Sequence, residues 1–444
     1  MSDSSSLDLV SQAMQEGDLD QAASVCDQVI ADEPDNARAY LMRGVVHAQQ
    51  AEFQSAVNCF HRATELRPDA ANYHFNLALA YQHLEQRDEA IASYRAAIEC
   101  KPDFLEAQNN LGNLLVDDDD PAEAIAHFRS LAETHPDEAF VHYNLANVLQ
   151  DAGDYTDSID AFRRAIELDP DFPSARENLG RALSDVTRYE EAAEVWRDWL
   201  KHEPGNAVAS HMLAALGHAE APDRCNDEFV KGTFDHNFAR SFEEQLRRLE
   251  YNVPKLMADK VASVVPDATD LEVLDAGCGT GLCGPDLRKY ARRLVGVDLS
   301  PEMLVEAKAK QVYDELVEAE LSSYFSQDPS KYDLMICADT LCYFGDLSLV
   351  MHAVPSMLKP GGSFLFSVEK IADEEEAEGD ASGETGAERS SSSYELQPNG
   401  RYSHEEDYVR NVLAESNLEI KSFESCVLRK ERGRDVVGFV VVVS

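Results

Sequence analysis

The sequence predicts two domains of different classes, an α-helical repeat array in the first half and a doubly wound α/β domain in the second. Prolines recur every 34 residues between positions 34 and 204, which indicates a repeated structural unit. In the second half, apolar strand-like segments alternate with helix-like segments, as in a parallel sheet with helices on both faces. A glycine-rich turn follows the first of these strands. With 444 residues the chain is long enough for both domains.

The first half keeps one register throughout. Prolines stand at Pro34, Pro68, Pro102, Pro136, Pro170 and Pro204, small residues at Gly44, Ala78, Gly112, Ala146 and Gly180, and aromatic residues at Phe60, Tyr94, Phe128, Phe162 and Trp196. A 34-residue helix-turn-helix unit is typical of tetratricopeptide (TPR) repeats, which stack into an α-solenoid. We therefore expect five full repeats over 37–206, with degenerate caps that extend the array to 1–217.

Four asparagines recur at one position of the repeat, namely Asn76, Asn110, Asn144 and Asn178. An amide both donates and accepts hydrogen bonds, so a ladder of amides can bind an extended peptide backbone without reading its sequence. The repeats resemble the superhelix of the protein O-linked glucosaminyl transferase, in which such asparagines line the inner face and bind a peptide. Repeat-consensus residues without a ligand are the alternative interpretation.

The second half opens with LEVLDAGCGTGLCGPDL at 271–287, in which an apolar strand ends on Asp275 and four glycines follow. The next strand ends on Asp298. Glycines let the backbone approach a ligand closely, and a carboxylate at the end of the next strand can hydrogen-bond a ribose diol. The carboxylate beside the glycines favours a cationic, amino-bearing ligand, because it would repel a pyrophosphate. A nicotinamide dinucleotide and a purely structural turn are the alternatives.

At D-A-G-C-G-T-G and V-D-L-S-P-E-M-L the chain resembles the class I S-adenosylmethionine (SAM) methyltransferases. This resemblance implies a Rossmann-like domain over 229–444, after a linker at 218–228, with a seven-stranded sheet whose last strand is antiparallel. It also implies the cofactor SAM, with the methionine moiety held by Asp275, Gly277, Gly279 and Gly281, the ribose by Asp298, and the adenine and methyl surroundings by Leu299, Met303, Glu320 and Ala338. The further stretches ADTLCYFGDL, GRYSHEEDYV and VLRKERG are similar to a bacterial family of TPR-containing methyltransferases whose substrates are undefined.

Secondary structure is expected in the order that this fold requires. We expect leading helices over 229–265, strands at 272–275, 294–298, 333–337 and 363–369, helices at 301–319 and 405–416, and two final strands joined at 431–434. The third strand is assigned to the stretch AELSSYF, with Glu320 in the place of the acid that contacts adenine. The acidic, Ser/Gly-rich insertion at 372–393 is expected to be disordered.

The residues that would handle the methyl acceptor are less clearly indicated. A hydroxyl or amine acceptor often needs a base and a carboxylate does not. Candidate catalytic residues are His236, His404, Asp339 and Tyr343, and candidate substrate contacts are Tyr251, Arg401 and Tyr402. The run of four aspartates from Asp117 to Asp120 is interpreted as a solvated turn that caps a helix, so no metal site is expected.

Composition restricts the partners. A net charge of −44 disfavours nucleic acid as a direct partner, because its phosphates would be repelled. Nine cysteines without a C-x-x-C pair, and the absence of a membrane-length apolar run, favour a cytoplasmic protein with reduced thiols. We expect a SAM-dependent methyltransferase whose TPR array recruits a protein or carrier-bound substrate. A peptide-binding scaffold with a non-catalytic SAM domain and an NAD-dependent oxidoreductase are the alternatives.

Overall fold

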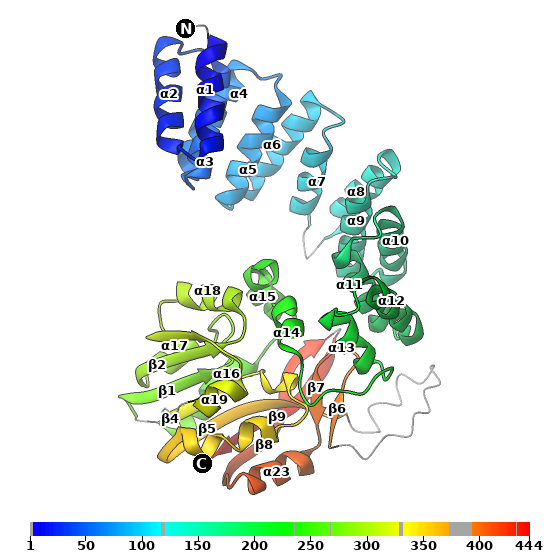
Figure 1. The fold of residues 1–444 in the computed structure, drawn as a ribbon, viewed down its shortest axis with the longest axis vertical. Coiled ribbons are helices and arrows are strands. Elements are labelled where there is room, and N and C mark those ends of the chain that lie inside the picture. Colours follow the sequence, from blue (N-terminus) through cyan, green and yellow to red (C-terminus); the bar gives the residue numbers. More distant parts are fainter. Residues whose placement is uncertain are drawn as a thin grey trace. The chain divides into compact units, whose positions relative to one another are not determined.

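The computed structural model describes residues 3–116, 120–234, 236–266, 268–327, 332–372, 393–431 and 433–444. The chain divides into two compact units, Met1–Ala182 and Leu183–Ser444 (Figure 1). Most of the aspartate run at 117–120 and of the insertion at 372–393 lies outside the described residues. In the part of the chain that is described, no helix is long and apolar enough to cross a membrane.

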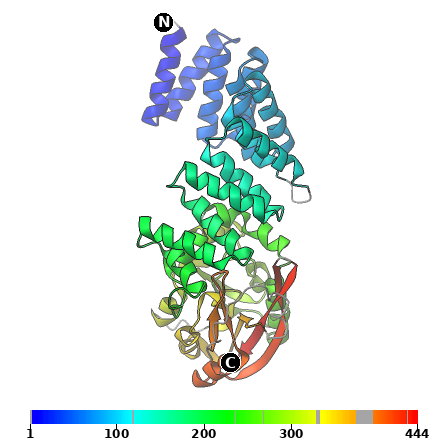
Figure 2. The same ribbon diagram turned by 90° about the vertical axis from the view of Figure 1, so that its right-hand side faces the viewer.

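The first unit consists of antiparallel helix pairs, which Figure 2 shows stacked one after another. Its helices are α1 (Asp3–Glu16), α2 (Leu19–Asp32), α3 (Ala37–Gln49), α4 (Phe53–Leu66), α5 (Ala71–His83), α6 (Arg87–Cys100), α7 (Leu105–Leu114), α8 (Ala122–Thr134), α9 (Ala139–Asp151), α10 (Tyr155–Leu168) and α11 (Pro173–Asp185). The boundary between the units falls within α11, so α12 (Tyr189–His202) and α13 (Ala207–Ala215) belong to the second unit.

The small residues of the repeat make room for the aromatic side chains. A Cβ atom on Gly44 would lie 2.5 Å from the ring of Phe60, and one on Gly112 would lie 2.5 Å from the ring of Phe128. Both rings are almost completely buried. The two helices of a repeat can approach this closely only because one of them lacks a side chain at the crossing point.

Replacing Gly44 by alanine is therefore expected to destabilise the first unit by about 1 to 3 kcal/mol, since the new methyl group overpacks the crossing against Phe60. Urea unfolding followed by circular dichroism measures this free energy. Gly205→Ala, at a turn of the second unit, is the control for an added methyl group without a clash, because no atom lies within 4 Å of the added Cβ atom there. Equal stability of the two variants would contradict the packing argument.

The second unit is built on one twisted sheet with a mainly parallel core. Its strands are β1 (Leu271–Ala276), β2 (Ala291–Asp298), β3 (Glu315–Glu318), β4 (Tyr332–Cys337), β5 (Leu358–Lys370), β6 (Tyr394–Leu396), β7 (Tyr402–His404), β8 (Ile420–Glu431) and β9 (Arg434–Val443). Strands β3, β2, β1, β4 and β5 are parallel neighbours in this order, and β9 pairs antiparallel with both β5 and β8. The predicted reversed last strand is confirmed. The described sheet has nine strands instead of seven, because the hairpin β6–β7 adds to the end of β5.

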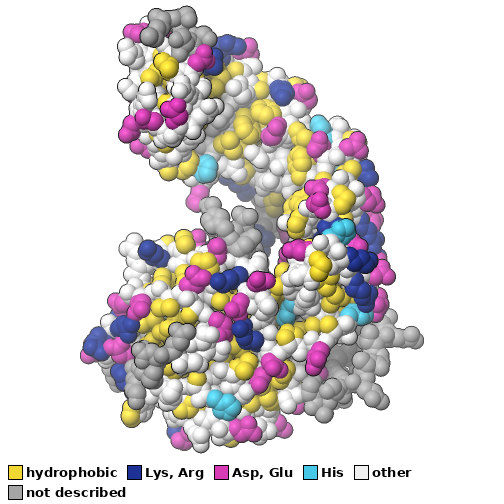
Figure 3. All heavy atoms as spheres, viewed as in Figure 1, with side chains coloured by type: hydrophobic (Ala, Val, Ile, Leu, Met, Phe, Trp, Pro, Cys, Tyr) yellow, Lys and Arg dark blue, Asp and Glu magenta, His cyan; other side chains and the backbone are white. Residues whose placement is uncertain are grey.

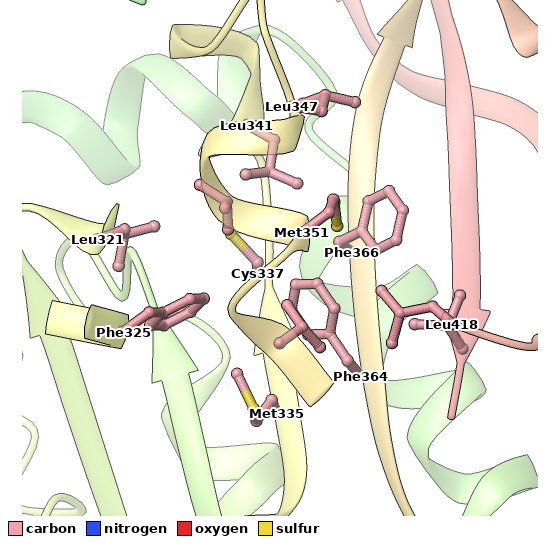
Figure 4. Packing of buried hydrophobic residues seen from close by; sticks show 14 of the residues in the cluster. Leu321, Phe325, Met335, Cys337, Leu341, Leu347, Met351, Phe364, Phe366 and Leu418 are labelled. Atoms are coloured by element: carbon pink, nitrogen blue, oxygen red, sulfur yellow. The ribbon is translucent and has the colours of Figure 1, made fainter. Parts of the chain in front are cut away.

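Both faces of the sheet are covered, as the apolar sequences of its central strands require. Phe364 and Phe366 of β5 point to one face, where Figure 4 shows them packed with Met351 and other apolar side chains. Leu365 points to the other face and joins a second cluster, which includes Met257 of α16. The helices of this unit are α14 (Asp227–Thr233), α15 (His236–Arg248), α16 (Val253–Val264), α17 (Gly284–Arg288), α18 (Pro301–Ala309), α19 (Leu321–Gln327), α20 (Ser348–Met351), α21 (Val354–Met357) and α23 (Glu406–Glu415), with a 3-10 turn, η1, at Leu341–Tyr343.

Two expectations about the segment around β3 are wrong. The helix predicted over 301–319 ends at Ala309, where Gln311 takes a φ of +54° and turns the chain toward β3. The stretch AELSSYF is not a strand, because 321–327 forms α19. The apolar periodicity of this segment is compatible with a helix, but residues 315–318 form β3 because they pair with β2.

The segment 218–228, predicted as a linker, is hydrogen-bonded through residues 222–225 to the rest of the second unit. The Cys225 amide donates to the Tyr343 carbonyl at 2.8 Å, and the Gly345 amide donates to the Asp223 carbonyl at 2.9 Å. Just before it, the buried imidazole of His211 on α13 lies 2.9 Å from the Gly400 carbonyl. The chain therefore reaches the sheet along a fixed path within this unit.

Candidate cofactor site and a buried charge cluster

The glycine turn after β1 and the carboxylate at the end of β2 are joined directly. Asp298 accepts a hydrogen bond from the Gly279 amide at 2.8 Å and another from the Ser300 amide at 2.9 Å. Gly279 has a φ of +53°, and the nearest atom to a Cβ placed there is 3.8 Å away, in Met303. The turn thus presents open backbone beside a carboxylate at the carboxyl ends of two adjacent parallel strands, where ligands of such sheets bind.

The electrostatics of Asp298 result from opposing effects. Burial raises the pKa of its carboxyl group, while the hydrogen bonds from the Ser300 and Gly279 amides act in the opposite direction. Ser300 also caps α18 by accepting from the Met303 amide at 3.2 Å. The predicted adenine-side residues Leu299 and Met303 therefore lie directly after the carboxylate, at the start of this helix.

The other glycines of the turn have packing roles that the sequence pattern did not reveal. A Cβ on Gly277 would lie 2.1 Å from Thr340 Oγ1, so this glycine allows β1 and the segment after β4 to meet. Gly281 faces the ring of Tyr313, whose hydroxyl donates to Asp275 Oδ2 at 2.7 Å. Neither Thr340 nor Tyr313 carries a local sequence signal, because each is brought to the turn by the sheet.

Helix α15 is attached to this turn. Glu243 on α15 accepts hydrogen bonds from Thr280 Oγ1 at 3.1 Å and from Lys310 Nζ at 2.6 Å. The Ser300 hydroxyl also donates to the carbonyl of Phe234, a residue just before α15, at 3.0 Å. The backbone of the candidate base His236 lies in the first turn of α15, and its side chain lies outside the described residues. The leading helices thus border the glycine turn.

A largely buried cluster of two acids and two arginines lies at the carboxyl ends of β4 and β5. Arg401 binds Asp339 Oδ1 at 2.5 Å and also pairs with Glu369. Arg429 binds Glu369 Oε1 at 2.9 Å and lies 3.8 Å from Asp339. Asp339, Cys342 and Glu369 offer ligand atoms within 4.8 Å of one another, but arginines already neutralise both carboxylates. Sequence reasoning found Asp339 and Arg401 and missed Glu369 and Arg429.

Asp339 has two unusual properties. Its φ of +53° is rare for a residue other than glycine, and such strain is concentrated at functional sites. Burial raises the pKa of its carboxyl group, although Arg401 and Arg429 act to lower it. The buried Tyr251 lies close enough that the charge of Asp339 adds to the effect of burial in raising the pKa of that phenol. Tyr251 thus lies within the charge environment of Asp339, and their shared role at an acceptor site stays a prediction.

The remaining predicted residues of the acceptor site have defined partners. The Tyr343 hydroxyl lies 3.4 Å from Arg401, and burial raises the pKa of this phenol. His404 is fully buried, its Nε2 lies 2.9 Å from the Phe344 carbonyl, and burial lowers its pKa to about 4. The Tyr402 hydroxyl donates to the Pro222 carbonyl. A neutral His404 in this position holds the turn after η1, which does not favour it as a base.

Glu320 follows the carboxyl end of β3, and Ala338 follows the carboxyl end of β4. Glu320 caps α19 by accepting from the Ser322 and Ser323 amides at 2.9 and 2.8 Å. Burial raises the pKa of Glu320, but these hydrogen bonds outweigh that effect and leave the pKa below its usual value. Ala338 directly follows β4 and precedes Asp339. In the structure the Glu320 carboxylate is thus committed to the helix cap.

The repeated asparagines of the first unit form contacts between neighbouring helices. Asn144 donates to Asn109 Oδ1 at 2.6 Å, and Asn178 donates to Asn147 Oδ1 at 2.9 Å. Asn110 donates to the Tyr94 hydroxyl at 3.2 Å, whereas Asn76 donates to the carbonyl four residues earlier in its own helix. All four side chains are half-buried, so each keeps amide groups at the surface.

Comparisons with known proteins agree with both halves of this architecture. A methyltransferase domain model matches residues 274–366, which include the end of β1 and all of β2, β3 and β4. Tetratricopeptide repeat models match residues 13–80, 71–104, 109–173 and 143–207. This chain carries tetratricopeptide repeats and a methyltransferase domain. The prediction of the domain type is confirmed, and with it SAM as the cofactor.

Curated relatives match only the methyltransferase region. The ubiquinone biosynthesis O-methyltransferase of Pseudoalteromonas translucida is 28% identical over 121 residues, which are 26% of this chain and 51% of the relative. The enzyme of the same name from Alkalilimnicola ehrlichii is 26% identical over 124 residues, 26% of this chain and 49% of the relative. The chain thus spans about half the length of the curated relatives it matches.

Solved structures resemble each half separately. Magnesium protoporphyrin IX methyltransferase from Synechocystis PCC 6803 with bound SAH (S-adenosylhomocysteine) is 17% identical, covers 49% of this chain and 99% of its own, and gives a TM-score of 0.38. YrrB, a TPR protein with an unusual peptide-binding site, is 20% identical, covers 43% of this chain and 98% of its own, and gives a TM-score of 0.36.

The geometry of the domain fits SAM. The open backbone at Gly279 leaves a cradle for the ligand, and Asp298 has the charge and position to accept from ribose hydroxyls. Asp275 is a buried carboxylate without a cationic partner among the described residues, which suits a cationic ligand. A dinucleotide pyrophosphate would be repelled by both carboxylates.

Proposed function

We propose that the protein transfers a methyl group from SAM to an acceptor on a protein or carrier that the TPR array holds. The observation that carries this proposal is the link between Asp298 and Gly279, beside open backbone, within the matched methyltransferase domain. The ubiquinone biosynthesis enzymes named above are O-methyltransferases, which agrees with the reaction class. The nine cysteines are free thiols, and we place the protein in the cytoplasm.

In this proposal two carboxylates bind different parts of the cofactor. Asp298 orients the ribose through its hydroxyls, Leu299 and Met303 flank the adenine, and Asp275 with the glycine turn holds the methionine end. SAM supplies a methyl group on a sulfonium whose leaving group is already activated. Because the chemistry needs little more than alignment, the main contribution of the chain is to position the acceptor and exclude water.

The acceptor site lies beside Ala338 and Asp339, at the carboxyl end of β4. Phe234 contacts the ring of Tyr343 edge-on, with centroids 5.9 Å apart, and Tyr251 lies near Asp339. These rings make an apolar wall, while Asp339 can accept a proton from a hydroxyl or ammonium acceptor. Arg401, which was predicted to contact the substrate, forms an ion pair with Asp339 and so holds that carboxylate in place.

The TPR array supplies the recruitment surface in this proposal. Asn110, Asn144 and Asn178 are linked to neighbouring helices, and their remaining donors and acceptors can pair with an extended peptide backbone. The strongly acidic chain disfavours nucleic acid as the recruited partner. A protein or a carrier-bound acceptor is the partner that this surface fits.

The test follows a radioactive methyl group from SAM into a proteome incubated with the full chain. We expect labelled protein with the wild type and at least a tenfold loss when the four asparagines are replaced by alanine, with SAH binding unchanged. Asn58→Ala, an exposed asparagine on the other helix of a repeat, is the matched control. Equal labelling by the fourfold variant would contradict recruitment by the ladder. SAH binding without any labelling would favour a scaffold that binds SAM and does no chemistry.

A further inference from the structure

Tyr313 fills a space that three glycines leave open. A Cβ atom would lie 2.9 Å from its ring at Gly281, 2.7 Å from its hydroxyl at Gly284 and 3.0 Å from its ring at Gly296. Gly281 belongs to the turn after β1, Gly284 begins α17, and Gly296 lies in β2. Three glycines from two segments therefore accommodate one tyrosine, so part of the glycine pattern serves Tyr313 and not the ligand directly.

The hydroxyl at the end of this ring reaches Asp275. Tyr313 donates to Asp275 Oδ2 at 2.7 Å, and Asp275 is only 1% exposed. The other titratable groups that face Asp275 are Asp298 on β2, Cys278 and Cys283 on the turn, and Cys337 on β4. Burial raises the pKa of each of these thiols, so they stay neutral. Among the described residues no lysine or arginine contributes to the charge environment of Asp275.

This environment differs sharply from that of the second buried acid of the site. Asp339 is neutralised by Arg401 and lies near Arg429. Among the residues that the structure describes, Asp275 has the neutral phenol of Tyr313 as its side-chain donor. A buried carboxylate without a cation is unfavourable unless a partner arrives. Of the two acids, Asp275 is thus the one that is prepared for a cationic ligand.

We propose that Tyr313 is a positioning residue for the cofactor, and that its hydroxyl holds the Asp275 carboxylate ready to bind the ammonium group of the methionine moiety. This inference rests on the proposed function. It assigns a role to a residue outside the glycine motif and gives a packing reason for the glycines at positions 281 and 284, where Tyr313 would be the nearest neighbour of an added Cβ atom. It also predicts weak binding of anionic nucleotides, because the ionised Asp275 carboxylate would repel their phosphates.

The arrangement makes cofactor binding depend on pH. Burial raises the pKa of Asp275 to about 7, the hydrogen bond from Tyr313 lowers it, and the charge of Asp298 raises it. Asp275 must lose its proton before it can attract an ammonium group, so affinity should fall about tenfold for each pH unit well below the pKa. Binding near neutral pH should then release a proton to the buffer.

Removing the Tyr313 hydroxyl should shift the pH dependence of cofactor binding to higher pH. Tyr313→Phe keeps the ring that fills the glycine space and removes the group that lowers the pKa of Asp275. The pKa therefore rises, and at pH 7 a smaller fraction of the protein has the ionised carboxylate. Affinity at pH 7 should fall several-fold, while the affinity of the two proteins should converge at high pH.

The experiment is a calorimetric titration of SAH into the full chain between pH 6 and pH 9, in buffers of different ionisation enthalpy. For the wild type we expect about a tenfold weaker Kd at pH 6 than at pH 8. For Tyr313→Phe we expect the midpoint to move to higher pH and more proton to be released at pH 7. Tyr290→Phe, which removes a hydroxyl from another buried tyrosine of the same unit, is the matched control and should keep the wild-type profile.

Each outcome separates the inference from the function on which it rests. If Tyr313→Phe binds SAH with the wild-type midpoint and proton release, Tyr313 is a packing residue only and the inference is overturned. If the wild type shows no proton release, Asp275 does not meet the ammonium group and the inference fails as well. If the wild type binds no SAH at any pH, the proposed function itself fails.

Discussion

Replacing Asp298 by alanine is expected to weaken SAH binding at least about a hundredfold. A hydrogen bond to a charged group contributes about 1.5 to 3 kcal/mol, and two ribose hydroxyls would lose such a bond. The substitution also removes the acceptor for the Gly279 and Ser300 amides, so the turn after β1 loses its attachment to the start of α18.

Calorimetry with SAH on the full chain measures this effect, and two further variants interpret it. Asp298→Asn keeps an acceptor oxygen for one amide and should bind more tightly than Asp298→Ala, though still weakly. Asp286→Ala removes an exposed carboxylate from α17 and should leave Kd within about twofold of the wild type. A Kd for Asp298→Ala within a factor of three of the wild type would exclude Asp298 as the ribose ligand.

The cofactor end of the site could be predicted because its residues are close in sequence or follow from a topological rule. Asp275 and Gly279 lie in one turn, and Asp298 ends the next strand of the same parallel sheet. The carboxyl ends of adjacent parallel strands meet at one edge, so sequence alone places these residues together. The repeat array could be predicted for a similar reason, since each packing contact recurs within a short distance along the chain.

The partners of these residues could not be predicted, because tertiary packing alone brings them in. Tyr313 reaches Asp275 from the segment before β3. The sequence pattern around Tyr313 predicts a helix, which would not bring its hydroxyl to Asp275. Glu369 and Arg429 come from β5 and β8 and meet Asp339 only when β9 has reversed between those strands. The local periodicity of a sequence carries no information about such long-range contacts. For the same reason, it did not show that the segment after Ala309 pairs with β2 instead of continuing the helix.

Removing Glu369 is expected to destabilise the second unit by about 3 to 5 kcal/mol, because Arg401 and Arg429 would lose their shared acceptor in a buried site. Burial raises the pKa of Glu369, but the two arginines outweigh it and hold the pKa below its usual value. Its stabilising contribution is therefore complete above the unfolded pKa of about 4.3 and is lost as pH falls through the lower folded pKa. The difference between Glu369→Ala and wild type should shrink in acid.

Urea unfolding followed by tryptophan fluorescence measures this change, since both tryptophans, Trp196 and Trp199, lie in the second unit. Glu406→Ala is the matched control, because it breaks an exposed pair with Arg410 and should change stability by about 0.5 kcal/mol or less. A Glu369→Ala variant as stable as this control would show that the arginines find other partners in the folded unit.

A double variant shows whether charge balance or the particular contact is responsible. Glu369→Leu with Arg429→Met removes one charge of each sign and leaves Asp339 paired with Arg401. Because apolar residues can replace a buried ion pair at little cost, the double variant should be more stable than Glu369→Leu alone. If the double variant instead loses as much stability as the two single variants together, Arg429 and Glu369 act independently. Arg429 would then stabilise the fold through Asp339 and Glu431. The cluster would then be two separate pairs, and Asp339 would keep its charge environment when Glu369 is lost.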